Sequence, residues 1–442
     1  MGDWAALSEL LDRLGPGDAD ERADVARQVY SQLEARRTAE PTSDQAAVHT
    51  NLKRWLARMA SSRVQQDQLA ATALLSVMVD ADSLEDSEAV RMATQIKSLM
   101  QAPDMEVCVE TMAVYRRLLL KRSRIVLSSV EADISRRLET LDGERSEVQR
   151  LVTLRLIEMV CGENLVPLYA YAPKLFASLT GLLCDRRLDT REAAGRALGA
   201  CLGAVPLAER NPWLNVMFDD LQRSQLAGNV DSLHGSQLIC QELLQNGGEY
   251  MQPHFAQTFE TAMRLTTHRD GHVRRAAIEQ LPMLAKYSPH EFSRIGASGE
   301  SMLSRSCNYL VDLARSADSE RATAFVALGQ IAQHCSFEFG PFLEPAMRAI
   351  RDILAQQANA HSKNAADTSD GVTHGILQAI AMLAAAMGSA LAEHMGDILD
   401  LMLAAGLSQP LCDALHALVR KVGQLQPAVL ARVLDVVSVV LT

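Results

Sequence analysis

Two histidines four residues apart form the most metal-like pattern in this sequence. His268 and His272 have the spacing that places two imidazoles on one helix face, as in zinc sites. They flank Gly271 in a polar segment, and no cysteine or carboxylate cluster stands nearby to complete a set of ligands. We therefore favour a solvated turn between two helices and predict no metal-binding residues.

A histidine next to a cysteine is the second candidate for chemistry. His334 could activate the Cys335 thiol, but no third group that would orient the imidazole is evident. The favoured interpretation is a helix-end histidine beside a packed cysteine. The sequence also lacks a Gly-rich phosphate loop, a kinase catalytic loop and an H-E-x-x-H pattern. We predict no catalytic residues and no cofactor.

The strongest basic run spans Tyr115 to Arg124 and could bind phosphates or an acidic partner. Its leucines recur at helical spacing, so the charged face near the end of a helix is the favoured interpretation. The whole chain has 43 Lys and Arg against 54 Asp and Glu, a net charge of −11. A protein that binds nucleic acid needs a basic surface, so we predict no nucleic-acid partner.

The elements that would carry these residues are predicted to be helices. Aromatic residues make up only 4% of the chain, and it has 24 glycines and 14 prolines, too few for a loop-rich β-sandwich. Good helix formers dominate the rest. Eight scattered cysteines form no C-x-x-C pair, which indicates reduced thiols in a cytosolic or nuclear protein. The start lacks the cationic region of a secretory signal.

One segment is apolar enough to resemble a membrane span. Gly375 to His394 is rich in alanine but contains Gln378, Ser389 and Glu393. We interpret it as a packed helix of a soluble protein and predict no transmembrane segment.

A thirteen-residue helical pattern recurs along the chain. In the copy from Val273 to Ala285, apolar residues stand at offsets 4, 5, 8, 11 and 12 from the anchor, which is one helix face. The ten anchors, of which those at 22, 66, 233 and 411 are weaker, are Arg22, Gln66, Val107, Val148, Thr190, Leu233, Val273, Glu320, Val372 and Leu411. Their spacing of 39 to 52 residues matches HEAT or armadillo repeats.

A second amphipathic helix fits between successive anchors, as in Pro253 to Leu265. Two helices per repeat leave no room for the third helix of armadillo repeats. The sequence therefore predicts an all-α protein, a HEAT-repeat α-solenoid (an armadillo-like superhelix) of about ten helix pairs. Stacked pairs of this kind share one continuous core.

Short polar turns join the two helices of a repeat. In two of these turns an aspartate precedes an arginine, Asp270 with Arg274 and Asp318 with Arg321. This order is typical of HEAT repeats, where the pair helps to form a ladder of contacts between neighbouring repeats. We predict this structural role for the four residues.

The chain is predicted to be a single continuous HEAT solenoid over 1–442, with a mobile inter-helix loop at 355–371. The loop prediction rests on a polar stretch without an apolar period. The last helix, Ala428 to Leu441, is apolar and carries no polar cap. We expect either that the natural protein continues beyond Thr442 or that a partner covers this end.

Several segments together resemble the N-terminal HEAT region of the target of rapamycin (TOR) kinases. The most similar is Ser319 to Ala332, followed in order by Met382 to Ser408. Cys184 to Leu202 and Ala277 to Phe292 also resemble family members. The resemblance is strong over 165–442, whereas over 20–164 it rests on repeat register. The long insertion that the family often has after the repeat containing Glu242 is absent.

The resemblance implies a scaffold rather than an enzyme. In the family this solenoid contributes to a dimeric TOR complex and binds Raptor, so Raptor-like subunits and TOR complex components are the implied partners. The serine/threonine kinase domain is missing from this chain. The implied location is cytoplasmic, with peripheral association with lysosomal or vacuolar membranes through the complex. The alternative is a stand-alone HEAT adaptor, similar to a phosphatase scaffold or a transport receptor, and an enzyme on a helical array is a third hypothesis.

Overall fold

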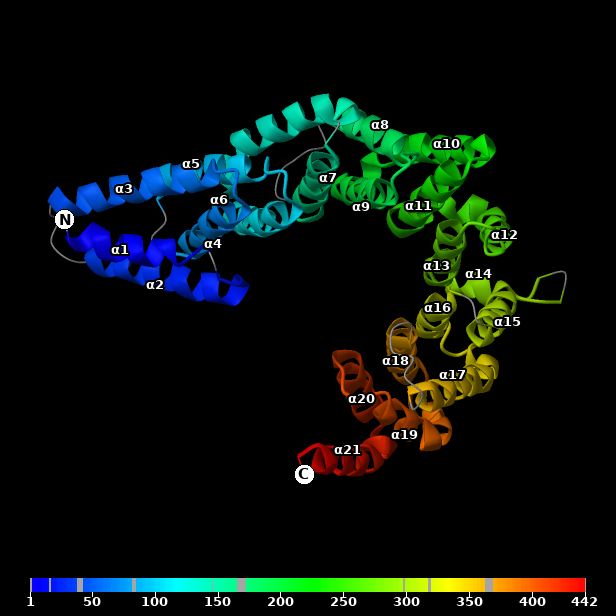
Figure 1. Cartoon of the computed structure of the whole chain (residues 1–442). Helices are drawn as coiled ribbons and strands as arrows, with labels where there is room; N and C mark the ends of the chain where they lie inside the picture. The colour runs from blue at the N-terminus through cyan, green and yellow to red at the C-terminus, as the bar shows by residue number, and fades with distance from the viewer. Residues whose placement is uncertain are drawn as a thin grey trace. The chain divides into compact units, whose positions relative to one another are not determined.

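The structure is a computed structural model that describes residues 2–15, 17–37, 43–81, 85–144, 146–164, 172–296, 299–316, 319–361 and 369–441. Every element named in these ranges is an α-helix or a short 3-10 helix, and one isolated β-bridge pairs Ile295 with Ser301 (Figure 1). The prediction of an all-α protein is therefore confirmed.

The chain divides into two compact units, Met1–Val216 and Met217–Thr442. The division falls within helix α10 (Asn211–Ala227). Each unit is a stack of helix pairs and is described by itself.

Unit 1 contains two layers of helices. The first layer contains the helices with the repeat anchors, and we call it the anchored layer. Its helices pack in the order α2, α4, the first half of α6, α7 and α9. The second layer consists of α1, α3, α5 and α8, which pack against the anchored helices. The bounds are α1 Gly2–Asp12, α2 Ala19–Arg37, α3 Ser43–Ala60, α4 Gln65–Asp80, α5 Asp86–Leu99, α6 Met105–Thr140, η1 Leu141–Gly143, α7 Glu147–Gly162, α8 Ala172–Leu182, α9 Leu188–Ala204 and η3 Leu207–Glu209.

Helix α6 serves two repeats because it bends in the middle. Arg122 has φ −136° and ψ 32°, which is outside the helical region. The part before it lies in the anchored layer, where Tyr115, Leu118 and Leu119 are buried. The part after it flanks the next anchored helix, α7.

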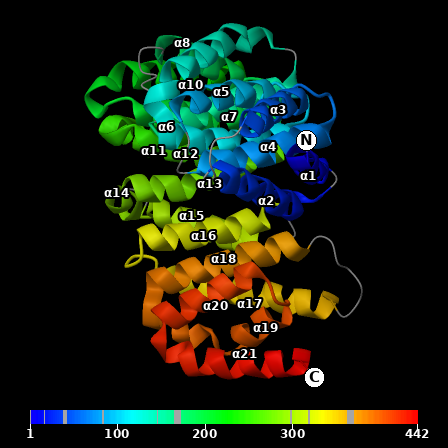
Figure 2. The same cartoon turned by 90° about the vertical axis from the view of Figure 1, so that its left-hand side faces the viewer.

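Unit 2 repeats the two-layer arrangement. Its anchored layer is α11, α13, α16, α18 and α20, and Figure 2 shows α16, α18 and α20 one below the next. The bounds are α11 Val230–Asn246, η4 Gly248–His254, α12 Phe255–Leu265, α13 Gly271–Tyr287, α14 Pro289–Ser293, α15 Met302–Arg315, α16 Arg321–His334, α17 Gly340–His361, α18 Ser369–Met387, η5 Gly388–His394, α19 Gly396–Ala404, α20 Gln409–Lys421, η6 Gly423–Leu425 and α21 Gln426–Leu441.

All ten predicted repeat segments form helices of the anchored layer. In the copy anchored at Val273, the five offset residues are completely buried, namely Ala277, Ile278, Leu281, Leu284 and Ala285. The copies anchored at Glu320 and Val372 bury their offset residues equally well. The HEAT-solenoid prediction is confirmed at this level.

Three of the weaker copies are shifted by one residue. After the anchor Leu233, the buried residues are Cys240, Leu243 and Leu244, each one position before the predicted one, and Gln245 is exposed. The copies at Arg22 and Leu411 show the same shift. In the copy after Leu233, three of the five predicted positions are glutamines, namely Gln237, Gln241 and Gln245. The apolar pattern of this copy therefore fits better one residue earlier.

The predicted loop at 355–371 is only partly described. Helix α17 continues to His361 and α18 begins at Ser369, so both ends of this range are helical. Residues 362–368 lie outside the described part of the chain, and the loop there stays a prediction.

The apolar segment Gly371–His394 is long and apolar enough to cross a membrane. In the structure it is a core element of unit 2, because α18 packs between α16 and α20. Its α-helix ends at Met387, and a 3-10 helix follows. Ile376, Ile380 and Leu383 are completely buried against the neighbouring repeats.

Helices α16 and α18 approach each other closely because glycines stand at their contact. A Cβ atom at Gly375 would lie 2.9 Å from the Ala322 carbonyl oxygen. A Cβ atom at Gly329 would lie 2.8 Å from Cε of Met382 and 3.1 Å from Cα of Ala379. Glycine is therefore required at both positions for this spacing.

Candidate functional site

The turn before α13 is built around Asp270. Its carboxylate accepts hydrogen bonds from the backbone N–H groups of His272 (3.0 Å) and Val273 (3.2 Å), which makes Asp270 the N-cap of α13. Burial alone would raise the pKa of Asp270, but these two hydrogen bonds lower it. The aspartate thus stays ionised and fixes the start of the helix.

Arg274 binds the same turn and also reaches the next repeat. Its Nη1 donates to the carbonyl oxygens of His268 and Arg269, both at 3.0 Å. Its Nη2 donates to Oε1 of Glu320 at 2.8 Å, and the Glu320 side chain is only 2% exposed. Burial alone would raise the pKa of Glu320, but hydrogen bonds from Ser319 and Arg274 lower it. Arg274 therefore contacts Glu320 across repeats, while Asp270 caps the helix.

The second predicted pair is described only in part. Asp318 lies outside the described residues, so its role stays a prediction. Arg321 donates through Nε to the carbonyl oxygen of Ser316 at 2.6 Å. This contact closes the turn before α16 within one repeat.

The same contact recurs in other repeats, although the sequence pattern did not lead us to predict it. A side chain in the first turn of an anchored helix donates to a carbonyl five or six residues earlier. Examples are Arg22 to Gly17 (2.7 Å), Gln68 to Ser62 (2.9 Å), Arg150 to Glu144 (2.5 Å) and Arg191 to Asp185 (2.7 Å). An arginine or glutamine stands at or within two residues of the anchors Arg22, Gln66, Val148 and Thr190 and was the available signal. The anchors Val107, Leu233 and Val372 have neither residue there.

The two histidines of the metal-like pattern have other contacts. Nδ1 of His268 accepts the backbone N–H of Asp270 at 3.1 Å. The ring of His272 lies edge-on to His234, with centroids 6.2 Å apart. Within the described ranges, no three His, Cys, Asp or Glu side chains are placed to hold a metal ion.

The structure separates the environments of His334 and Cys335. Cys335 is 1% exposed, and burial raises the pKa of its thiol. His334 lies on a groove with Lys286, and burial followed by the positive charge of Lys286 lowers its pKa. Both shifts oppose an imidazolium–thiolate pair.

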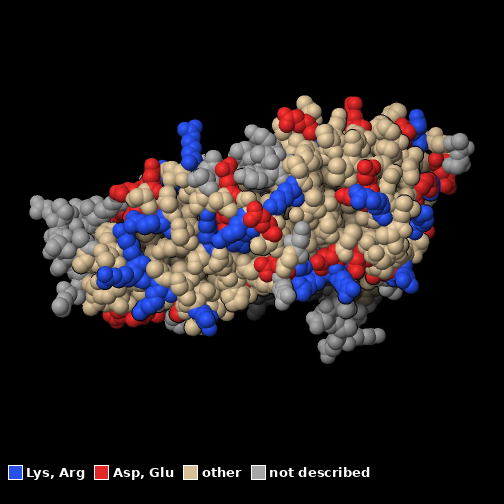
Figure 3. Space-filling view, turned by 90° about the horizontal axis from the view of Figure 1, so that it is seen from above, with Lys and Arg blue, Asp and Glu red and all other residues tan. Residues whose placement is uncertain are grey.

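The basic run from Tyr115 to Arg124 is largely paired with acidic groups of unit 1. Nε of Arg116 donates to Glu163 at 2.6 Å, and Arg117 pairs with Asp80. Lys121 donates to the carbonyl oxygen of Asp80 at 2.8 Å. On the face drawn in Figure 3, Lys and Arg lie among Asp and Glu side chains. These contacts favour the interpretation of a charged helix face.

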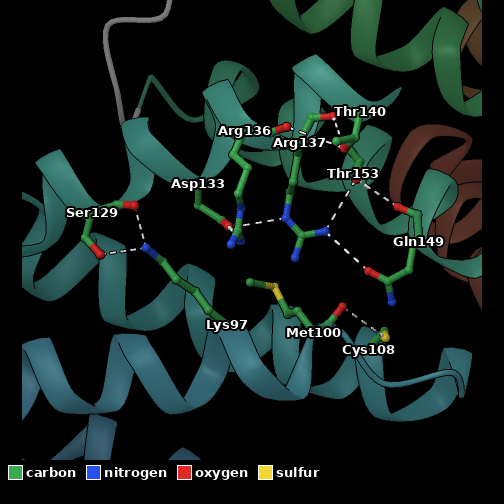
Figure 4. A network of polar contacts seen from close by, with 10 residues as sticks. All are labelled: Lys97, Met100, Cys108, Ser129, Asp133, Arg136, Arg137, Thr140, Gln149 and Thr153. Atoms are coloured by element: carbon green, nitrogen blue, oxygen red, sulfur yellow. Dashed lines mark hydrogen bonds and ion pairs between the residues drawn. The ribbon is translucent and has the colours of Figure 1, made fainter. Parts of the chain in front are cut away.

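A buried polar network joins α6 to α7 in unit 1 (Figure 4). Nε of Arg137 lies 3.1 Å from Oδ2 of Asp133, and these side chains are 8% and 3% exposed. Nη1 of Arg137 also lies 3.4 Å from Thr153 and 3.5 Å from Gln149. Asp133 and Arg137 stand four residues apart on α6, so the contacts of Arg137 with Gln149 and Thr153 are the ones that join α6 to α7.

Two further members of the network are Lys97, on α5, and Cys108, near the start of α6. Lys97 of α5 donates to Oγ of Ser129 at 2.6 Å, and burial lowers the pKa of Lys97. Sγ of Cys108 lies 3.5 Å from the Ala102 carbonyl oxygen, and burial raises the pKa of this thiol to about 11. A protonated thiol in this setting is a packing group.

A groove of about 580 Å³ runs over α13, α16 and α18 in unit 2. Its lining recurs by repeat position, since Met283, Gln330 and Met382 each stand ten residues after their anchors. Lys286 and Gln333 stand thirteen residues after theirs. The groove is therefore built by the repeat itself and presents methionines, amides, Lys286, Glu279 and the histidines His334 and His374.

A second groove, of about 460 Å³, lies over α2, α4 and α6 in unit 1. Its charged residues pair with each other or with neighbours: Arg22 with Glu110 at 3.5 Å, and Arg117 with Asp80. A ligand there would have to displace these contacts.

Comparison with curated proteins finds TOR kinases. The chain is 26% identical over 401 residues to serine/threonine-protein kinase tor1 of Schizosaccharomyces pombe, covering 90% of this chain and 16% of that protein. It is 27% identical over 387 residues to TOR of Oryza sativa, covering 86% of this chain and 15% of that protein. It is 29% identical over 347 residues to TOR of Arabidopsis thaliana, covering 77% of this chain and 13% of that protein. The chain thus spans about one sixth or less of the length of these relatives.

Comparison with solved structures finds nuclear transport receptors. Importin beta in an ammonium sulfate condition superposes with a TM-score of 0.55 at 13% identity, covering 99% of this chain and 54% of that chain. Kap95p bound to RanGDP gives a TM-score of 0.54 at 14% identity, covering 94% of this chain and 57% of that chain. At such low identity the likeness shows the solenoid fold alone.

No family model matches the chain. The repeat register, the buried helix faces and the relatives nevertheless agree with one another. The resemblance is thereby confirmed: this chain is a HEAT-repeat solenoid similar over most of its length to a segment of the TOR serine/threonine-protein kinases.

Proposed function

We propose that this solenoid is a protein-interaction scaffold of a TOR-type complex. The observation that supports the proposal is the similarity to TOR kinases over 77% to 90% of the chain. In this proposal the solenoid docks a Raptor-like subunit and contributes to a dimeric complex in nutrient and growth signalling. Phosphoryl transfer belongs to a kinase domain outside this chain.

The surface of the chain agrees with a binding role. Stacked helix pairs present side chains of several repeats side by side, so affinity is distributed over an extended surface with a few dominant anchors. Both units carry grooves over the anchored layer. A cytoplasmic location, with peripheral membrane association through the complex, is part of the same proposal.

The experiment is native purification of the tagged endogenous protein, followed by a denaturing gel and mass spectrometry. We expect peptides of a TOR-type kinase domain, in the same polypeptide or a stable partner, together with a Raptor-like subunit. A 48 kDa polypeptide without kinase peptides would contradict the proposal. It would then favour the stand-alone adaptor, similar to a transport receptor or a phosphatase scaffold.

A further inference from the structure

We infer that the groove over α13, α16 and α18 binds an extended segment of a partner protein, with an acidic side chain of that segment beside Lys286 and His334. This inference rests on the proposed scaffold function and adds a site and a ligand chemistry to it. We call this surface the α13–α18 groove.

Three amide side chains of the groove are free to bind a ligand. Among the described residues, Gln330, Gln333 and Gln378 line the groove and make no hydrogen bond to another side chain or to the backbone. Each amide offers both a donor and an acceptor. The ligand that matches this pattern is a peptide whose own N–H and C=O groups are unpaired. That requirement favours an extended segment over a helix, which satisfies its own backbone groups.

The positive charge of Lys286 at one end of the groove favours an acid there. Glu279, which also lines the groove, stands seven residues earlier on α13, about two helical turns away. Lys286 is exposed and makes no ion pair within the described part of the chain. His334 lies near enough for the lysine charge to lower its pKa. A carboxylate between them would interact favourably with both groups. The groove over α2, α4 and α6 in unit 1 lacks this property because its arginines already pair with Glu110, Asp24 and Asp80.

The apolar lining and the fixed floor complete the site. Met283 and Met382 stand on opposite helices of the groove, and methionine adapts to different apolar side chains. The floor between α16 and α18 is held by the close approach at Gly375. The volume lies within the range of roughly 300–1,000 Å³ that is usual for ligand sites.

The test uses the purified 442-residue chain and a phage library of random dodecapeptides. We expect enriched peptides to share one Asp or Glu flanked by apolar residues. The enriched peptide, measured by fluorescence anisotropy, should bind Lys286→Glu at least tenfold more weakly than the parent. Selection on Lys286→Glu should replace the shared acid with Lys or Arg.

Matched variants separate the parts of the inference. Lys53→Glu, at an exposed lysine on a different groove of unit 1 that lies over α2, α3 and α5, should leave the affinity unchanged. The double variant Gln330→Ala and Gln333→Ala should weaken binding severalfold without changing the preference for an acid. A peptide N-methylated on its central backbone amides should also lose affinity if the amides pair with its main chain.

Several results would overturn the inference. These are no enrichment on a correctly folded chain, enrichment of amphipathic helical peptides, equal affinity for the parent and Lys286→Glu, or groove-dependent self-association of the chain. Each leaves the proposed scaffold function standing if kinase and Raptor-like peptides still co-purify with the Lys286→Glu protein. Loss of co-purification from the parent protein would instead contradict the proposed function.

Discussion

Arg274 shows how single residues join one repeat to the next. Its guanidinium closes the turn before α13 and also binds the buried carboxylate of Glu320. A buried acid without its partner is costly, so each residue depends on the other.

Replacing Arg274 with alanine should lower the free energy of unfolding by about 1.5–3 kcal/mol, because a charged hydrogen bond is lost. Urea unfolding followed by circular dichroism measures it. Arg275→Ala, on the exposed side of the same helix, is the control and should change stability by less than about 0.5 kcal/mol. Equal effects of the two variants would show that the contact with Glu320 contributes nothing.

The same contact predicts a pH dependence. The pKa of Glu320 is lower in the folded chain than its usual value of 4.5, so ionised Glu320 stabilises the fold above that pH. This contribution is lost as the pH falls through the lowered pKa. The stability difference between the parent and Glu320→Gln should therefore be constant from about pH 7 to about pH 5 and shrink below the usual pKa. A difference that grows on acidification would contradict the assignment.

Leu281 tests the repeat register. It stands at offset 8 from Val273 and is completely buried. Leu281→Ala should destabilise the chain by about 2–5 kcal/mol, through lost burial and the cavity left behind. Urea unfolding measures the loss, and a value near about 0.5 kcal/mol would mean that the helix packs by another face.

At the scale of the elements, glycine sets the distance between α16 and α18. The Ala322 carbonyl oxygen and Cα lie 2.9 and 3.1 Å from where a Cβ at Gly375 would be. Backbone atoms cannot move aside as the end of a flexible side chain can. The two helices would have to separate, which would also change the floor of the α13–α18 groove.

Gly375→Ala should therefore destabilise unit 2 by about 1–3 kcal/mol, the usual cost of overpacking. Gly371→Ala on the same helix is the matched control, because no atom lies within 4 Å of its added Cβ. The control should be neutral or slightly stabilising, since alanine is a better helix former. Thermal unfolding of both variants distinguishes them, and equal melting temperatures would refute the steric argument.

At the scale of the whole molecule, the accessibility of the cysteine thiols tests the packing of both units. Cys184 and Cys412 are exposed, while Cys108, Cys161, Cys201, Cys240, Cys307 and Cys335 are buried. Burial raises the pKa of Cys240 to about 12 and that of Cys108 to about 11. The thiols of Cys240 and Cys108 are thus protonated near neutral pH, and all six buried thiols are inaccessible to a reagent.

A thiol-reactive chromophore at about pH 8 should label two thiols quickly in the native chain and all eight after denaturation. The double variant Cys184→Ser and Cys412→Ser should show no rapid labelling. Fast reaction of a third thiol would mean that one of the repeats opens or packs differently.

The order of the residues is sufficient to predict the class of fold, the repeat period and the helices of the anchored layer. When one face of a helix is buried in every repeat, apolar residues recur at regular intervals along the sequence, as in Val273 to Ala285. The similarity to TOR kinases rests instead on a resemblance of particular segments in their order, such as Ser319 to Ala332 followed by Met382 to Ser408. The copy after Leu233 is one residue out of register because its anchor was placed by the repeat spacing, although glutamines stand at three of its predicted core positions.

Which polar groups meet depends on how the helices pack in three dimensions. Arg274 and Glu320 are 46 residues apart, and Arg137 of α6 meets Gln149 and Thr153 only where α6 packs on α7. The α13–α18 groove likewise depends on the distance between backbones at Gly375. Periodicity records which face of a helix is buried. It does not record how far apart two helices lie or which side chains their packing leaves without a partner, because those follow from contacts between distant residues.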